Sequence, residues 1–394
     1  HLGAGRGRSF DRKRRTTLAG AVTTSLSGDT GASTTRVNVA QIEQALDRLW
    51  SDLHNEGEVE HGVTRACKSN LIIACETEAQ ANAVRERIPD LVERHPARVF
   101  LLTECSPEVN SIQAEVSAHC RRFDGSKQLC SEHVDIRFDP AVAGRLGSVL
   151  RPLLIGDLPT ALWWASNQPP ALGGDVFTNL VALADHVIYD SVGWPRPAEG
   201  VRAMTRWVMG ESRPVFNLAW RYLKPWRRIL AQVLDPAVAP GALQNIDSVR
   251  VEHGPHALPV AWLLVGWLAA RLQWQPLKGE VQSGTEVSWA FRSPRGDLRV
   301  QIHRCSEGMA QVRKLNLAWQ GDAPGRAGFH YGDDHWLSLI PEESTLPVTG
   351  IPAREVPMEM MIAAQLAHRS KDPLFEQSIA VAQTMAEILN RQEG

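Results

Sequence analysis

The sequence predicts an α/β fold whose N-terminal sheet is mostly parallel or mixed and carries helices on both faces, followed by a C-terminal α+β unit with an antiparallel meander. Two observations predict this arrangement. Short apolar runs alternate with helix-length segments between residues 71 and 190, the order typical of a parallel sheet with helical crossovers. Between residues 287 and 340, apolar and polar residues alternate through successive short segments, which indicates antiparallel strands.

The first ordered element is predicted to be a helix that begins after Asn38. The Asn38 side chain and Gln41, three residues later, have the spacing of a capping box. The apolar side chains on one face of this helix are Val39, Ile42, Leu46, Leu49, Trp50 and Leu53. The elements predicted next are a buried strand over 71–75, a helix over 78–94 and a buried strand over 98–103.

A long hairpin is predicted next, because residues 112–118 and 134–138 alternate in polarity on either side of a turn centred on Gly125. In that register, residues equally far from Gly125 face one another, which places Cys120 across from Cys130. Facing residues of an antiparallel pair are close enough for a disulfide. The pair is then either a reversible redox device or two reduced small hydrophobic residues.

The same hairpin offers His119 and His133 beside Cys120 and Cys130 as zinc ligands. Their spacing is not that of a known zinc finger or ribbon, and His119 and Cys120 point to opposite faces of the strand. We therefore expect no metal here.

The remaining elements follow the same patterns. In the first unit they are a helix ending near Leu154, a strand over 160–165, a helix over 177–184, a strand over 186–190 and a helix over 217–234. In the second unit they are a strand over 249–252, a buried helix over 259–273, strands over 287–291, 298–303, 311–319 and 336–340, and two closing helices. Pro225 is expected to kink or divide the helix over 217–234.

Three regions are predicted from the composition along the chain. Residues 1–36 are basic and rich in Gly, Ser and Thr, so we expect a disordered arm, with an organelle transit peptide as the alternative. An N-terminal α/β domain is predicted over 37–246 and a C-terminal α+β domain over 247–394.

The charge balance and the cysteine content bound the class of protein. The 394 residues include 42 Lys+Arg and 44 Asp+Glu, a formal net charge of -2, which argues against a nucleic-acid partner. The apolar runs fall short of the roughly 20 residues that a membrane span needs, so no membrane association is expected. Six cysteines are too sparse for a disulfide scaffold, and we expect a cytoplasmic protein. The 13 tryptophans indicate either filled cores or contact surfaces.

Motifs for catalysis and cofactor binding are absent from the sequence. No glycine-rich dinucleotide motif follows a strand, and P-loop, zinc-protease and hydrolase-elbow motifs do not occur, so no catalytic residue and no cofactor is predicted. Asp157 beside Trp163 and Trp164 has the residue types of a sugar site. On a strand, however, the two indoles point to opposite faces, which favours a turn carboxylate beside a structural strand.

The segment over 217–231 is dense in Trp and Arg, including Trp220, Trp226 and Arg227. Such residues are typical anchors of protein interfaces. The alternative is a helix packed on the sheet with an arginine-rich exposed edge.

Four motifs occur in the order and at the spacing of one known family. They are His95-Pro-x-Arg98, Cys130-x-Glu132, Asp157-Leu-Pro-x-x-Leu-Trp-Trp164 and Leu218-x-Trp-x-x-Leu-x-Pro-Trp-Arg227. Over residues 38–235 the chain resembles the glucose-6-phosphate dehydrogenase assembly proteins, known as OpcA, and residues beyond 235 resemble them more loosely.

The resemblance implies a non-catalytic regulatory partner that binds glucose-6-phosphate dehydrogenase, promotes its active oligomer and raises NADPH production in the oxidative pentose phosphate pathway. The candidates for partner contact are then Asp157, Trp163, Trp164, Trp220, Pro225, Trp226 and Arg227. Redox control through Cys120 and Cys130, with thioredoxin as a second partner, is also implied, although the adjacent cysteines of family members are here Cys130 and Ser131. The alternative is a sugar-phosphate-handling enzyme that uses Asp157 and neighbouring Arg residues.

Overall fold

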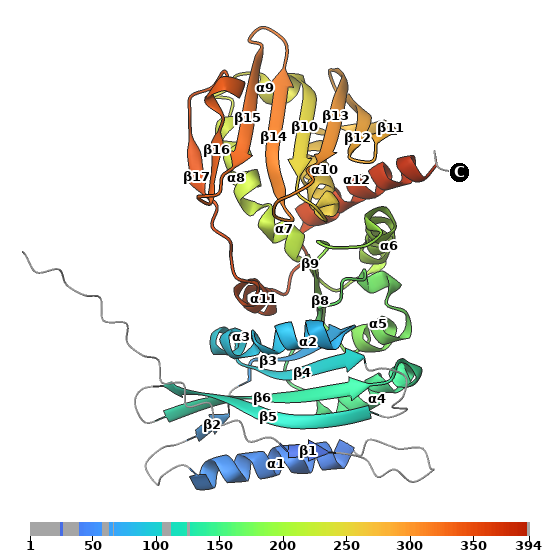
Figure 1. Cartoon of the computed structure of the whole chain (residues 1–394), viewed down its shortest axis with the longest axis vertical. Coiled ribbons are helices and arrows are strands. Elements are labelled where there is room, and N and C mark those ends of the chain that lie inside the picture. Colours follow the sequence, from blue (N-terminus) through green and yellow to red (C-terminus); the bar gives the residue numbers. More distant parts are fainter. Residues whose placement is uncertain are drawn as a thin grey trace, which may run out of the picture.

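The computed structural model describes residues 24–26, 39–56, 63–65, 67–104, 112–123 and 127–391. The predicted cap at Asn38, the hairpin turn at Gly125 and most of the predicted arm lie outside these ranges. The chain forms two sheets that follow one another along the long axis of the molecule (Figure 1).

The first sheet has nine strands among the described residues. They are β1 (Thr24–Leu26), β2 (Val63–Arg65), β3 (Ser69–Cys75), β4 (Ala97–Glu104), β5 (Ile112–Phe123), β6 (Lys127–Phe138), β7 (Thr160–Trp164), β8 (His186–Tyr189) and β9 (Val215–Asn217). Their order is β1-β5-β6-β4-β3-β7-β8-β9, with β2 also paired to β6. The strands from β6 to β9 run parallel, whereas β5 is antiparallel to β6. The predicted mixed sheet is confirmed.

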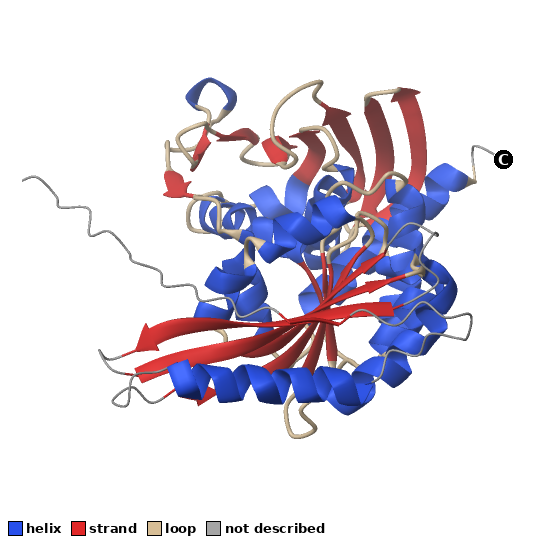
Figure 2. Cartoon of the chain, turned by 60° about the horizontal axis from the view of Figure 1, so that its bottom comes forward, coloured by secondary structure: helices blue, strands red, loops and turns tan. Residues whose placement is uncertain are grey.

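Helices cover both faces of this sheet (Figure 2). Packed on one face are α2 (Glu78–Arg85), α3 (Ile88–Arg94) and α11 (Met358–Leu366). Packed on the other are α1 (Val39–Glu56), α4 (Leu146–Leu150) and α5 (Gly174–Val181), with the short 3₁₀ helices η1 (Pro140–Arg145), η2 (Arg151–Leu153) and η3 (Pro170–Leu172). The single helix predicted over 78–94 is wrong: α2 ends at Arg85 because Pro89 has no N–H to donate to the Arg85 carbonyl.

The part of the chain that the structure describes contributes eight strands to the second sheet. They are β10 (Ile246–His253), β11 (Gln275–Ser283), β12 (Glu286–Ser293), β13 (Gly296–Arg304), β14 (Val312–Trp319), β15 (Gly325–Tyr331), β16 (Trp336–Leu339) and β17 (Gly350–Pro352). Their order is β11-β12-β13-β10-β14-β15-β16-β17. Most pairs are antiparallel, as predicted, but β10 lies between β13 and β14 and runs parallel to β13, so the meander is interrupted.

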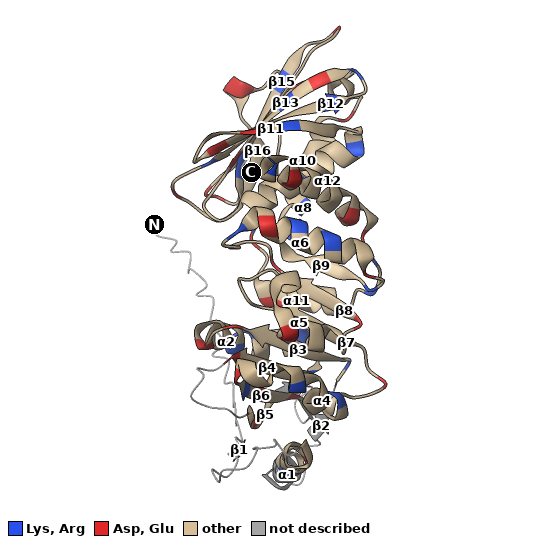
Figure 3. Ribbon diagram, turned by 90° about the vertical axis from the view of Figure 1, so that its right-hand side faces the viewer, with Lys and Arg blue, Asp and Glu red and all other residues tan. Residues whose placement is uncertain are grey.

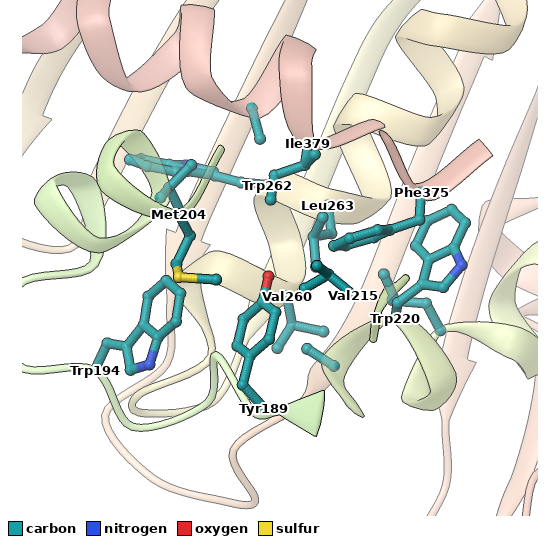
Figure 4. Packing of buried hydrophobic residues seen from close by; sticks show 14 of the residues in the cluster. Tyr189, Trp194, Met204, Val215, Trp220, Val260, Trp262, Leu263, Phe375 and Ile379 are labelled. Atoms are coloured by element: carbon teal, nitrogen blue, oxygen red, sulfur yellow. The ribbon is translucent and has the colours of Figure 1, made fainter. Parts of the chain in front are cut away.

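The remaining helices lie between the two sheets or beside the second one. They are α6 (Pro197–Gly210), α7 (Leu218–Tyr222), α8 (Lys224–Val233), α9 (Ala242–Asn245), α10 (Leu258–Leu272) and α12 (Pro373–Asn390), with the 3₁₀ helix η4 (Pro341–Glu343). On α10, Gly266 allows a close approach to α12, because an added Cβ would lie 2.3 Å from the Ser378 carbonyl oxygen. Between the sheets, Tyr189 of β8 packs near Val260 of α10 (Figure 4). Buried apolar residues of both sheets belong to one continuous core.

The surface carries charges of both signs. Lys and Arg are interspersed with Asp and Glu along the side of the molecule shown in Figure 3. Within the described ranges, every helix is too short or too polar to pass through a bilayer.

Candidate functional site

A hollow of about 340 Å³ opens at the carboxyl ends of β3, β4, β6 and β7, the edge where parallel α/β sheets bind ligands. Glu76 and Glu104 line it, and the Ser166 hydroxyl donates to Glu76 Oε2 at 2.9 Å. Burial, and to a smaller extent the charge of Glu76, raises the pKa of Glu104. The hollow therefore presents two carboxyl groups where a nucleotide site presents N–H donors to phosphates.

The N-terminus of α2, which follows β3, is capped by its own side chains. Gln80 Oε1 accepts from the N–H groups of Glu76 at 2.9 Å and Thr77 at 3.2 Å, while the Gln80 N–H donates to Thr77 Oγ1 at 3.2 Å. This capping box already uses the N–H groups of Glu76, Thr77 and Gln80 at the place where a phosphate would bind. Beside it, burial raises the pKa of Cys75 to about 12, so the thiol stays protonated and is a poor nucleophile.

Trp163 and Trp164 of β7 are 2% and 5% exposed. They point to opposite faces of the sheet, as predicted, because Trp163 packs on the α2 and α3 side and Trp164 on the α5 side. The Trp164 indole donates to the Gln168 carbonyl at 2.8 Å and meets the Phe177 ring edge to face. Both indoles are core residues of the first sheet.

The tryptophans of the downstream motif lie in the core between the sheets. The Trp220 indole donates to Asp372 Oδ2 at 2.7 Å (Figure 4 shows Trp220 beside Phe375), and Trp226 is 3% exposed. The Arg227 guanidinium lies 3.5 Å from the centroid of the Trp220 ring and donates to the Trp220 carbonyl. Burial lowers the pKa of Arg227 to about 10. Pro225 lies at the start of α8, so the predicted division of this helix is confirmed.

These positions change which residues are candidates for partner contact. An indole that is at most 5% exposed offers almost no area to another protein. Direct partner contact by the four indoles is therefore excluded in this structure; they are those of Trp163, Trp164, Trp220 and Trp226. Their motifs describe packing between elements far apart in sequence.

The hairpin of β5 and β6 has the predicted register. Cys120 pairs with Cys130, and a disulfide joins the two, with Cα atoms 4.1 Å apart. On the opposite face of the hairpin the His119 and His133 rings stack, with centroids 5.6 Å apart, and burial lowers the pKa of His133 to about 3. Across the described residues, no group of three or more His, Cys, Asp and Glu side chains is placed to hold a metal ion.

A buried ion pair adjoins the disulfide. Glu132 of β6, two residues from Cys130, pairs with Arg98 of β4, and its Oε1 accepts from the Trp50 indole of α1 at 2.5 Å. The Glu132 side chain is fully buried and that of Arg98 is 11% exposed. This network ties α1 to the sheet beside the disulfide. Arg98 and Glu132 both occur in the family motifs, but no local pattern predicted that they meet.

Asp157 lies elsewhere. Asp157 is exposed and lies in the loop before β7, at the amino end of that strand. The hollow with Glu76 lies at the opposite, carboxyl end of β7. The structure therefore separates Asp157 from the carboxyl-edge hollow.

Two family models match the chain. Residues 89–206 match the model described as "Glucose-6-phosphate dehydrogenase subunit N-terminal domain" and residues 213–379 match the corresponding "C-terminal domain". Curated relatives include proteins named "Putative OxPP cycle protein OpcA". One from Nostoc punctiforme is 32% identical over 52% of this chain and 44% of its own length. One from Synechocystis sp. is 25% identical over 64% of this chain and 52% of its own length. The chain thus spans about half the length of these two relatives.

Solved structures show only distant likeness. An oxidoreductase from Sinorhizobium meliloti aligns with a TM-score of 0.43 and 11% identity, over 83% of this chain and 90% of that chain. The transcriptional regulator Gal80p from Kluyveromyces lactis aligns with a TM-score of 0.48 and 9% identity, over 82% of this chain and 90% of that chain. Neither likeness bears on function. The two family models, however, cover more than half of the chain between them, and the chain belongs to the glucose-6-phosphate dehydrogenase assembly family, OpcA.

Proposed function

We propose that this chain is a non-catalytic partner that binds glucose-6-phosphate dehydrogenase, promotes its active oligomer and so raises NADPH production. Membership of the assembly family supports this role. The observation that supports the non-catalytic part of this role is the carboxyl edge of the first sheet. There the capped N-terminus of α2 and the carboxyl groups of Glu76 and Glu104 disfavour the phosphates of a dinucleotide or a nucleotide.

An activator of this kind works by differential binding. It must bind the active oligomer more tightly than the inactive form, and a preference of a few kcal/mol shifts the population almost completely. The partner then needs an anchor on the exposed surface of this chain.

Trp336 is the best candidate for that anchor. It is 46% exposed, whereas the other tryptophans are buried or half-buried. Because Leu337 and Leu339 of β16 face the core, Trp336 projects from the outer face of the second sheet, where its ring lies against Gly350. A half-exposed indole on an outer sheet face is a side chain of the kind that dominates interface hot spots.

The test mixes the purified chain with the dehydrogenase of the same organism. We expect a complex of higher mass by light scattering and a change in the substrate dependence of NADPH production. Trp336→Ala should weaken the complex at least about tenfold, because central aromatic anchors dominate binding energy. Met209→Ala is the matched control, since Met209 is an exposed apolar residue of α6. No complex, with no kinetic change, would refute the assembly role; equal affinities for both variants would refute the anchor.

We also propose that the Cys120–Cys130 pair makes assembly redox-dependent, with thioredoxin as the reductant. The disulfide, the buried Glu132 and the attachment of α1 are contiguous, so reduction would loosen α1. Thiol trapping should label Cys120 and Cys130 only after treatment with reduced thioredoxin, and the affinity for the dehydrogenase should change with it. The same labelling in oxidised and reduced samples would refute a switch.

A further inference from the structure

A second hollow, of about 400 Å³, lies at the amino ends of β7, β8 and β9. It is lined by the loop over 156–159, by Asp185 and His186 at the start of β8, by Pro214 and by Arg369, which follows α11. Its volume is that of a small-molecule site. No local pattern joins these residues, because Arg369 lies more than 150 positions after His186.

His186 is the first sign that the hollow has a ligand. The side chain is 1% exposed, and its Nε2 has no hydrogen-bond partner among the described residues. The Phe216 ring packs edge-on against the imidazole at 5.8 Å and cannot accept or donate a conventional hydrogen bond. Burial, with smaller contributions from Arg369 and His95, lowers the pKa of His186 to about 4, although Asp185 acts in the opposite direction. A buried Nε2 without a hydrogen-bond partner costs folding free energy, which a ligand hydroxyl that reached it would restore.

The charged side chains around the hollow are the second indication that it has a ligand. Arg369 is exposed and forms no ion pair or hydrogen bond with the described residues. Its positive charge contributes to lowering the pKa of both His95 and His186. Asp157 is likewise exposed and unpaired within the described chain. Asp185 uses its Oδ2 to accept from the Thr160 N–H at 2.7 Å. The hollow thus combines one available guanidinium with two carboxylates and a neutral imidazole.

These groups select one class of ligand. A guanidinium binds phosphate or carboxylate through paired hydrogen bonds, and carboxylates accept hydrogen bonds from hydroxyl groups. A bare anion would meet repulsion from Asp157 and Asp185, while an uncharged polyol would leave Arg369 unused. We propose that this hollow binds a small phosphorylated polyol of the sugar-phosphate class, with Arg369 on the phosphate, Asp157 and Asp185 on hydroxyl groups, and His186 as a further hydrogen-bond partner.

The test is direct binding to the whole chain in the absence of the dehydrogenase, so its failure is separable from failure of the assembly role. Glucose 6-phosphate serves as the probe in titration calorimetry, with glucose and inorganic phosphate as separate arms. We expect glucose 6-phosphate to bind, and we expect glucose and inorganic phosphate each to bind at least tenfold more weakly. Arg369→Ala should weaken binding of the probe about tenfold or more, because a charge-assisted pair is lost. Arg206→Ala is the matched control, since Arg206 lines a separate hollow between α6 and α12.

Imidazole NMR signals supply an independent readout. The probe should shift the signals of His186 and leave those of His330, an exposed residue of β15, unchanged. Three results would overturn the proposal: no binding at millimolar probe, equal losses in Arg369→Ala and Arg206→Ala, or phosphate alone binding as tightly as the probe.

Discussion

Removing the Cys120–Cys130 disulfide should lower the unfolding free energy by an amount set by the number of residues between the two cysteines. The two cysteines are 10 residues apart in sequence. Closing a loop of that length removes about 9 cal/mol/K of chain entropy from the unfolded state, or about 2.7 kcal/mol at 25 °C. Wild-type protein should therefore lose about 2.7 kcal/mol of unfolding free energy on reduction, and Cys120→Ala/Cys130→Ala should show the same loss under oxidising conditions. Alanine is preferred to serine because Cys130 is fully buried.

Equilibrium unfolding in urea, with and without reductant, measures both changes. Cys305→Ser removes a half-buried thiol outside the bridge and should keep the full difference between oxidised and reduced protein. The double variant should show none. If oxidised and reduced wild-type protein unfold at the same urea concentration, the entropic reasoning fails or the bridge does not form.

Three further predictions concern buried polar groups. Arg98→Met takes the Arg98 cation away from the fully buried Glu132 carboxylate and should cost about 3–5 kcal/mol in urea unfolding; a loss under 1 kcal/mol, about the value of a surface pair, would contradict the burial of this pair. Trp220→Phe removes the hydrogen bond to Asp372 and should cost about 1–3 kcal/mol, whereas Trp336→Phe, at an exposed site, should cost far less in the same assay. Burial raises the pKa of Asp190 to about 6, so the folded state binds this proton more tightly than the unfolded chain does. The unfolding free energy of the wild-type protein should therefore fall relative to that of Asp190→Asn as the pH rises from about 4 to 6. If the two proteins show the same pH dependence of the melting temperature over that range, the raised pKa of Asp190 is refuted.

Patterns local in sequence predicted the first sheet well. The apolar runs located β3, β4, β7 and β8, and the symmetry of polarity about Gly125 placed Cys120 opposite Cys130. Each of these inferences depends on neighbours in the chain or on one tight turn. Two of the strands that the sequence did not reveal have weak local signals: β11 is an exposed edge strand with few buried residues, and β15 contains two glycines.

The candidate site consists of residues that are far apart in sequence and meet only in the folded chain. Local sequence patterns therefore did not predict it. The indole-rich motifs indicated interface anchors, but Trp220 finds its hydrogen-bond partner 152 residues away, at Asp372. The unpaired His186 and Arg369 come together only because α11 returns to the first sheet after the second sheet is complete. Sequence spacing carries no information about such a return.

The return of α11 also sets an order for synthesis. Met361, Ile362 and Leu366 of α11 fill the apolar face of a sheet whose last strand ends at Asn217. A nascent chain emerging from the ribosome has therefore completed all strands of that sheet well before the helix that seals it exists. During that interval the apolar surface beside α3 is open to chaperones. Any recombinant fragment that stops at residue 246 would keep that surface uncovered permanently.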